Sequence, residues 1–408
     1  MALLVQKFGG TSVGGLDRID GVAARVAASI AEGHQVVVVV SAMAGQTDSL
    51  LNLARAISSH GRPNPRELDA LLATGEQVSA ALLCMALEKV GYTARSFTGW
   101  QAGIKTDNLH GRASIDTIDT GSLTATLERG RIPVVAGFQG VGGENSITTL
   151  GRGGSDTTAV MLAAALGADE CQIFTDVDGV YRADPRVVEH AECLAEIEMA
   201  EMECLAAAGS KVLQVDSVRV AKEQAVALRV LSTFETDKPG TRVCADADLP
   251  VSGSGVTGIA CRRHLATLGI SLEGGDDLGS LLDKLTEASR LGGIDLALVR
   301  REVAEAGSMN FTFIVAEGDH DLAHEIMQPL ILERSGKLHI EQGVAEISMV
   351  GAAIPDHASC LEAAMACLEQ AGISSKAARK NELSCSLIVT DAQANDAVRH
   401  LYREFMID

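Results

Sequence analysis

The run Val36-Val37-Val38-Val39-Val40 decides how this chain is expected to fold. Five consecutive β-branched residues favour an extended strand, and an unbroken apolar strand is typical of a parallel sheet covered on both faces. Similar short runs recur along the chain, with amphipathic helical stretches between them. The first part of the chain is therefore predicted to be a three-layer α/β/α domain with a mainly parallel sheet. Further expected strands are Ala2 to Gln6, Pro133 to Ala136, Gln172 to Thr175 and Ala227 to Val230, and the expected helices are Ile19 to Glu32, Pro65 to Val90, Ser122 to Arg129 and Asp156 to Leu166.

A change in composition predicts where this domain ends. Residues 236–255 are rich in Asp, Lys, Pro, Gly, Ser and Ala, which is typical of a connecting loop. Beyond it, shorter strand and helix patterns repeat in the order of a small βαββαβ, or ferredoxin-like, unit. Two such units are expected, so the predicted domains are 1–245, 246–335 and 336–408. Their expected strands are Leu265 to Leu272, Ile294 to Arg300, Asn310 to Val315, Ala345 to Val350 and Ser384 to Thr390, with helices over Leu278 to Ser289, from His320, over His357 to Gln370 and over Ala392 to Glu404.

The bulk composition excludes several classes of protein. With 408 residues, of which 47% are hydrophobic and 3% aromatic, the chain has enough material for two or three α/β cores. Its formal net charge of −20 argues against a nucleic-acid partner. No signal peptide or membrane span is evident, so a cytoplasmic protein is expected. The nine cysteines form no Cys-x-x-Cys pair, which indicates small core residues rather than a metal site.

Lys7-Phe8-Gly9-Gly10-Thr11-Ser12 directly follows the first expected strand. Glycines at a tight strand-to-helix turn expose backbone N–H groups to an anion, and Lys7 adds a positive charge at the same place. The segment is neither a Walker P-loop nor a dinucleotide-binding Gly-x-Gly-x-x-Gly turn. The glycine pair alone would also fit an ordinary turn.

A second glycine-rich segment covers residues 148–158, just before an Ala-rich helix. Arg152 can bind a carboxylate through two parallel hydrogen bonds, and the helix N-terminus adds partial positive charge beside it. Asp156 fits an N-terminal helix cap from its local sequence. Glu76 lies in a helical stretch next to a helix-weakening glycine, where a solvated surface residue is the ordinary interpretation.

Taken together, five segments in this order resemble the signatures of aspartate kinases in the amino acid kinase family. They are Lys7 to Ser12, Ser41 to Asp48, Thr74 to Glu76, Thr148 to Thr158, and the nucleotide segment formed by Thr175 to Tyr181 and Ala183 to Arg186. In addition, Gly209 to Lys211 resembles the family's last nucleotide contact. The resemblance implies an ATP-dependent transfer of the γ-phosphate to the β-carboxylate of L-aspartate in amino-acid biosynthesis. It implies Mg²⁺ that arrives with ATP, since no dedicated metal cage is visible in the sequence.

The resemblance also implies roles for individual residues. Lys7 would neutralise the transferring phosphoryl group, and Asp156 would hold Lys7 through an ion pair. Glu76 would receive the substrate ammonium group and Arg152 a substrate carboxylate. The other implied substrate contacts are Ser41, Thr47, Gly153, Gly154 and Ser155, and the implied nucleotide contacts are Lys7, Gly9, Gly10, Thr175, Asp176, Tyr181, Asp184, Pro185, Arg186 and Lys211.

The C-terminal third resembles the paired ACT domains that regulate aspartate kinases. The family's Gln-Asn pair is replaced here by Val299-Arg300, and its Ser-Thr-Ser-Glu segment by residues 379–382. We therefore expect weak or altered feedback by lysine or threonine, as would suit a specialised pathway. Because no methionine lies between Met202 and Met309, a single kind of subunit is favoured. The expected assembly is a homodimer or homotetramer through the ACT-like units.

Three alternatives remain beside this interpretation. Another amino acid kinase would keep the fold, but should not combine the Lys7 segment with Glu76 and Arg152. A kinase for a modified aspartate would use the same contacts. A non-catalytic amino-acid sensor would explain the ACT-like units, but should have lost Lys7 or Asp156.

Overall fold

The protein is described by a computed structural model that covers residues 1–245, 254–272, 278–292, 294–303, 309–333, 336–354 and 356–407. The chain forms two compact units. The first holds residues 1–180, 193–206 and 211–249, and the second holds residues 181–192, 207–210 and 250–408. The segment 181–192 thus belongs to the second unit although it follows a strand of the first.

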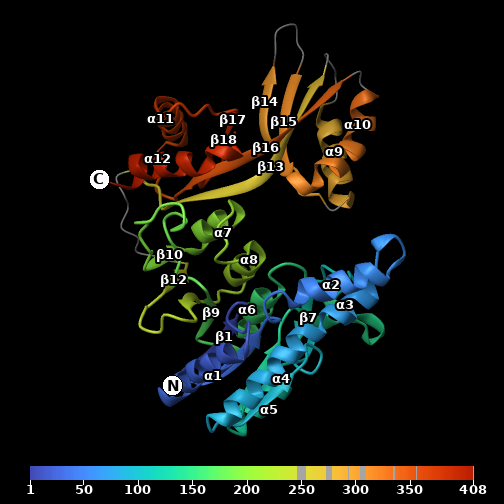
Figure 1. The fold of residues 1–408 in the computed structure, drawn as a ribbon, viewed down its shortest axis with the longest axis vertical. Helices are drawn as coiled ribbons and strands as arrows, with labels where there is room; N and C mark the ends of the chain where they lie inside the picture. Colours follow the sequence, from blue (N-terminus) through green and yellow to red (C-terminus); the bar gives the residue numbers. More distant parts are fainter. Residues whose placement is uncertain are drawn as a thin grey trace. The chain divides into compact units, whose positions relative to one another are not determined.

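The first unit contains two sheets and eight α-helices among its described residues (Figure 1). The large sheet has the strand order β10-β12-β11-β9-β1-β2-β6-β3, and the small one has the order β5-β4-β7-β8. The strands are β1 (Leu3–Phe8), β2 (Gln35–Val40), β3 (Ala94–Phe97), β4 (Ile104–Thr106), β5 (Ile115–Ile118), β6 (Ile132–Ala136), β7 (Gln139–Val141), β8 (Ile147–Thr149), β9 (Glu170–Thr175), β10 (Glu196–Glu198), β11 (Leu228–Ser232) and β12 (Thr241–Cys244). The helices are α1 (Leu16–Ala31), α2 (Gln46–Ile57), α3 (Pro65–Leu72), α4 (Thr74–Lys89), α5 (Gly121–Glu128), α6 (Gly154–Leu166), α7 (Met199–Ala207) and α8 (Val215–Glu223).

The all-valine strand β2 lies inside the large sheet, between β1 and β6, and is parallel to both. Its five valines are almost fully buried. Val36, Val38 and Val40 pack with residues of α1 and α4, and because side chains alternate along a strand, Val37 and Val39 face the opposite layer. Helix α6 contacts β1, β2 and β9. The predicted α/β/α domain with a mainly parallel sheet is confirmed.

The structure differs from the sequence expectation in the segment 236–255, which was predicted to be a loop. Strand β12 lies within it and pairs antiparallel with β11 at one side of the large sheet. The turn before β12 needs Gly240, whose φ is +72° and whose missing Cβ would lie 2.1 Å from the Val230 carbonyl oxygen. Residues 246–253 lie outside the described residues.

The expected helix from Pro65 to Val90 is divided at Ala73 into α3 and α4. By length and composition, residues 65–89 could span a membrane, but half of the apolar window is buried in the protein. This is weak as a membrane signal, since the core helix of a soluble protein passes the same test. The stretch also carries two buried carboxylates, Asp69 and Glu76, which suits an interior helix.

The second unit has one six-stranded sheet in the order β14-β15-β13-β16-β18-β17 (Figure 1). The strands are β13 (Gly258–Leu272), β14 (Ala297–Val303), β15 (Met309–Ala316), β16 (Lys337–Val350), β17 (Ala377–Lys380) and β18 (Ser384–Thr390). The helices are α9 (Leu278–Gly292), α10 (His320–Leu332), α11 (His357–Gln370) and α12 (Ala394–Met406).

Two hydrophobic clusters in this unit share the long strands β13 and β16. One cluster joins Ile259 of β13 and Ile347 of β16 to residues of α11 and α12. The other joins Leu268 of β13 to residues of α9 and α10, with Leu338 of β16 packed against it. The two C-terminal units that we expected in tandem therefore use the same two strands. The limits 1–245, 246–335 and 336–408 stay a prediction.

Candidate active site

The loop that follows β1 is tightly packed against the loop that follows β2. The N–H of Ala44 donates to the Gly10 carbonyl oxygen over 3.1 Å, and a Cβ on Gly10 would lie 2.9 Å from the Ala42 carbonyl oxygen. Only glycine therefore fits at position 10 without a backbone shift. A Cβ on Gly9 would lie 3.4 Å from Lys7 Nζ, so this glycine leaves space beside the lysine.

Lys7 lies near the end of β1 and forms an ion pair with Asp156, in the first turn of α6. The Lys7 Nζ to Asp156 Oδ1 distance is 2.5 Å, and the two side chains are only 11% and 9% exposed. The predicted ion pair is thus present. Asp156 is not the helix cap that its local sequence suggested, because Gly153 occupies the N-cap position and α6 starts at Gly154. The carboxylate is directed to Lys7 instead.

The hydroxyl groups predicted for the substrate pocket lie at the carboxyl end of β2. Ser41 follows the strand, and its N–H donates to the Phe8 carbonyl oxygen over 3.1 Å. Thr47 lies in the first turn of α2, after a left-handed Gly45. Both residues are half-buried. The carboxyl edge of a parallel sheet is where α/β proteins usually bind their ligands.

Glu76 is buried, so the interpretation as a solvated surface residue is wrong. Its Oε1 accepts a hydrogen bond of 2.9 Å from the Ala42 N–H, while its Oε2 has no hydrogen-bond partner among the described residues. Burial raises the pKa of the Glu76 carboxyl to about 7, against the lowering effect of backbone hydrogen bonds. Gly75 makes this contact possible, because a Cβ there would lie 2.8 Å from the Ala42 Cβ.

Arg152 lies in the loop between β8 and α6 and is exposed. Among the described residues it has no ion-pair partner, so its guanidinium group can take an external anion. The loop around it is closely packed at its glycines: Gly153 has a φ of +73° and a Cβ there would lie 2.3 Å from the Gln214 Cγ. A Cβ on Gly154 would lie 2.8 Å from the Leu150 Cβ, and Ser155 is buried against Gly137.

The residues predicted to bind the nucleotide are divided between the two units. Thr175, Asp176 and Lys211 belong to the first unit. Thr175 ends β9, and its hydroxyl donates to the Asp176 carboxylate over 3.1 Å. Lys211 is exposed.

Tyr181, Asp184, Pro185 and Arg186 belong to the second unit. Arg186 and Asp184 form an exposed ion pair with an Nε to Oδ1 distance of 3.0 Å. Their segment is anchored there because the Ile259 N–H donates to the Arg182 carbonyl oxygen over 2.6 Å.

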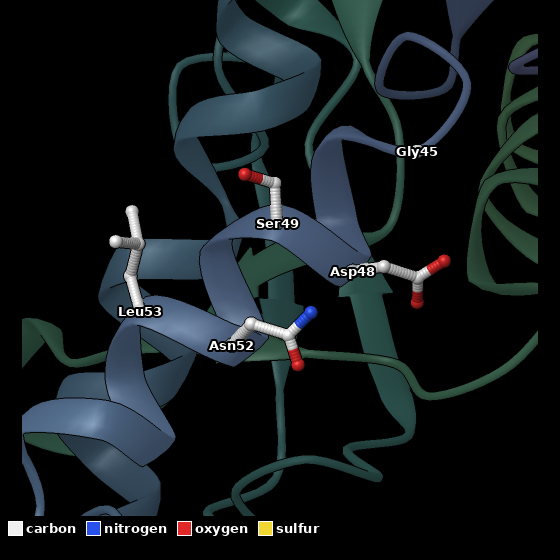
Figure 2. A pocket seen from close by; sticks show the side chains of 5 residues that line it. All are labelled: Gly45, Asp48, Ser49, Asn52 and Leu53. Carbon is white, nitrogen blue, oxygen red and sulfur yellow. The ribbon is translucent and has the colours of Figure 1, made fainter.

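A separate surface concavity of about 450 Å³ lies on α2 and contains none of these residues. Figure 2 shows the side chains of Asp48, Ser49, Asn52 and Leu53 that line it together with Gly45. Its lining comes from one helix and its N-terminal glycine. It is therefore not the candidate site, although α2 also carries Thr47.

The described part of the chain contains neither a metal-binding cluster nor a disulfide bond. No group of three or more His, Cys, Asp or Glu side chains there is arranged to hold a metal ion. None of the nine cysteines forms a disulfide bond, and none is exposed. Burial raises the pKa of the Cys84 thiol to about 12 and that of Cys261 to about 11, which keeps both thiols protonated at neutral pH.

A glycine-rich loop with a buried Lys–Asp pair at the carboxyl edge of a layered α/β sheet defines a phosphate-binding enzyme of the kinase class. Comparison with known proteins gives the same class, since residues 2–232 match the model of the amino acid kinase family. The aspartate kinase of Pseudomonas fluorescens is 42% identical over 409 residues, which cover 100% of this chain and 98% of the relative. The aspartokinase of Corynebacterium glutamicum is 41% identical over 414 residues, covering 100% and 97%.

Among solved structures, Escherichia coli aspartokinase III in complex with aspartate and ADP has the same fold. The TM-score is 0.81 at 25% identity, and the match covers 98% of this chain and 99% of that one. The chain therefore belongs to the aspartate kinases of the amino acid kinase family. It is an ATP-dependent kinase, and its C-terminal sheet is consistent with the ACT-like units of this family.

Proposed function

We propose that this chain transfers the γ-phosphate of ATP to the β-carboxylate of L-aspartate, giving 4-phospho-L-aspartate and ADP. The observation that carries the proposal is the buried Lys7–Asp156 pair beside the Gly9–Gly10 loop, close in the fold to the half-satisfied carboxylate of Glu76. Lys7 and the loop amides can bind a phosphoryl group, and the Glu76 carboxylate can bind an ammonium group. An amino acid and a nucleoside triphosphate are the two ligands that these groups fit.

In the proposed reaction, an oxygen of the aspartate β-carboxylate forms a bond to the γ-phosphorus as the bond to the ADP oxygen breaks. A carboxylate is already ionised at neutral pH, so no general base is required. Lys7 would neutralise the charge on the γ-phosphoryl oxygens, and Asp156 would fix the direction of its ammonium group. Mg²⁺ bound to ATP would supply further positive charge at the phosphates.

The substrate would be held by groups of opposite sign. Glu76 would accept the ammonium group through the oxygen that has no partner among the described residues. Arg152 would bind a substrate carboxylate, with Ser41, Thr47 and the Gly153–Ser155 backbone around it. The nucleotide is proposed to contact Thr175, Asp176, Tyr181, Asp184, Pro185, Arg186 and Lys211.

Weak or altered feedback is part of the proposal, and the second unit supports it. Val299 is 7% exposed and belongs to an apolar cluster, while Arg300 pairs with Glu302. Arg379 pairs with the fully buried Glu346 at 2.7 Å. Three of the residues that replace the family's effector segments, Val299, Arg300 and Arg379, thus have packing or partners of their own. A cytoplasmic homodimer or homotetramer, and service to a specialised pathway, stay predictions.

An ADP-release assay tests the proposed reaction and its regulation together. We expect turnover with L-aspartate, much less with L-glutamate, and less than about twofold inhibition by lysine or threonine at millimolar concentration. A hydroxylated aspartate that exceeds L-aspartate in kcat/KM would identify a modified aspartate as the substrate. No ADP release with any of these acceptors would contradict the kinase proposal and favour an amino-acid sensor. Strong inhibition by either amino acid would contradict only the regulatory part.

The raised pKa of Glu76 predicts a pH dependence for aspartate use. Below pH 7 the free enzyme holds Glu76 protonated, and a neutral carboxyl attracts an ammonium group less strongly. The kcat/KM for aspartate should therefore fall as the pH falls through about 7, because kcat/KM reports groups of the free enzyme. Bound ammonium favours the ionised form, so the midpoint of the kcat profile should lie at lower pH.

The variant Glu76→Gln is the control for this profile. It should lower kcat/KM for aspartate by about 10²-fold, as expected for a lost charge-assisted hydrogen bond, and remove the transition near pH 7. A profile that keeps the same transition in Glu76→Gln would assign the titration to another group.

A further inference from the structure

Asp69 is a fully buried carboxylate on α3 that bonds to two other segments of the first unit. Its Oδ1 accepts a 2.6 Å hydrogen bond from the Thr149 hydroxyl, and its Oδ2 lies 2.7 Å from His110 Nδ1. The N–H of Gly111 donates to both oxygens over 3.1 Å. Both oxygens of the carboxylate are thus engaged by residues from the 107–113 loop and from β8.

Such a group is costly to bury, because an ionised carboxylate loses its hydration. It remains in the interior only when nearby donors replace the water, as they do here. This replacement of the lost hydration requires that all three segments keep their positions. Asp69 therefore fixes α3, the 107–113 loop and β8 relative to one another more strictly than apolar packing would.

Each of these segments leads directly to the candidate substrate pocket. Helix α3 continues after Ala73 into α4, which carries Glu76. Strand β8 ends at Thr149, three residues before Arg152. The 107–113 loop lies against both, since the Ala113 N–H donates to the Thr149 carbonyl oxygen over 2.8 Å. The same loop lines the glycine before Arg152, because a Cβ on Gly151 would lie 3.3 Å from the Gly111 carbonyl oxygen.

We propose that Asp69 is a positioning residue for the acceptor substrate, acting through Thr149 and the 107–113 loop to set the spacing between Glu76 and Arg152. The inference rests on the proposed function, because it assumes that these two residues bind the charged groups of aspartate. The distance between the carboxylate of Glu76 and the guanidinium group of Arg152 would select among amino acids by the separation of their own charged groups. Among the described residues, the Asp69 side chain has no hydrogen bond to the Gly9–Gly10 loop, so we expect ATP binding not to depend on it.

The variants Thr149→Val and Thr149→Ser test this. Valine has almost the same volume as threonine, while serine is smaller by one methyl group. Valine removes the hydroxyl that donates to Asp69, while serine keeps it. We expect Thr149→Val to raise KM for aspartate about tenfold, as expected for a hydrogen bond to a charged group, and to change KM for ATP by less than about twofold. Thr149→Ser should restore KM for aspartate to within about threefold of the parent value.

Asp69→Asn provides a second, stronger change at the other end of the same contact. It keeps the shape but replaces one acceptor oxygen by a donor, so we expect a larger rise in KM for aspartate than with Thr149→Val. Binding of Mg·ADP, measured by calorimetry, should stay unchanged in both variants. Asp20→Asn is the matched control, because Asp20 makes only a surface pair with Lys89 among the described residues.

The outcomes separate this inference from the proposed function. Equal values for Thr149→Val and Thr149→Ser, or a parallel rise of both KM values and loss of Mg·ADP binding, would overturn the positioning role and leave a merely structural one. A parent enzyme with no aspartate-dependent ADP release would instead overturn the proposed function, and this inference with it. If Asp69→Asn does not fold, the Thr149 pair still decides the question.

Discussion

Replacing Lys7 by Met is expected to lower kcat by about 10³-fold, as expected for the loss of one preorganised charge-stabilising donor. Lys7 is paired with Asp156 at 2.5 Å, and both side chains are largely buried, which strengthens the effect of a positive charge on developing negative charge. The charge is needed mainly as the transition state forms. The affinity for ATP should therefore change by only about threefold.

Single-turnover kinetics and calorimetry with Mg²⁺ and a non-hydrolysable ATP analogue would measure the two quantities separately. Lys89→Met is a matched control, since it removes an exposed lysine that pairs with Asp20 at 2.7 Å. It should leave both quantities unchanged. A Lys7→Met enzyme with near-normal turnover would remove Lys7 from the catalytic machinery.

Stability must be followed in the same experiment, because Lys7→Met leaves Asp156 buried without its partner. Breaking a buried ion pair typically costs about 3–5 kcal/mol. The double variant Lys7→Met/Asp156→Asn removes the unpaired charge and should recover part of that loss in thermal unfolding. Its turnover should stay low. Recovery of turnover together with stability would mean that the single variant was merely unfolded.

Replacing Arg152 by Ala is expected to raise KM for aspartate by about 10²-fold or more. An arginine can form two parallel charge-assisted hydrogen bonds with a carboxylate, each of which is stronger than a neutral one. Arg152 is exposed in the free enzyme, so its loss should cost little stability. KM for ATP should be nearly unchanged.

Arg152→Lys and Arg129→Ala complete this series of variants. Lysine keeps the charge but not the two-pronged geometry, so an intermediate KM for aspartate is expected. Arg129 is an exposed arginine at the end of α5, and its loss should have no effect. If Arg152→Ala binds aspartate as tightly as the parent enzyme, Arg152 does not contact the substrate.

The layered fold was predictable because its strongest signals are local. Five valines in a row are typical of a strand that is covered by helices on both faces, and β2 has this environment. The small sheet of β4, β5, β7 and β8 was not predicted. Its strands have three or four residues and mix polar with apolar side chains, so no periodicity develops.

The candidate site was predictable where a residue's chemistry is unusual for its position. Lys7 beside two glycines and Arg152 among glycines are examples. The backbone N–H of Ala42 that binds Glu76 could not be found in this way, since an alanine gives no chemical signal. Asp69 was missed because a single carboxylate in an amphipathic helix looks like a surface residue until its burial is known.

The division of residues between the two units was also beyond the sequence. Residues 175–186 form one continuous motif in the chain, yet Tyr181 and Arg186 belong to the second unit and Thr175 to the first. The unit to which a residue belongs depends on its tertiary partners. For this segment one such partner is the Ile259 N–H, which lies far along the chain from Arg182.

Strands β13 and β16 each pass through two hydrophobic clusters of the second unit, the one that includes residues of α11 and α12 and the one that includes residues of α9 and α10. A gene deletion that removed either cluster would cut a continuous strand and leave the remaining half without its antiparallel neighbour. The two clusters therefore cannot be gained, lost or exchanged as separate modules by recombination. In evolution and in protein engineering, the six-stranded sheet region therefore has to be kept or transferred as one piece.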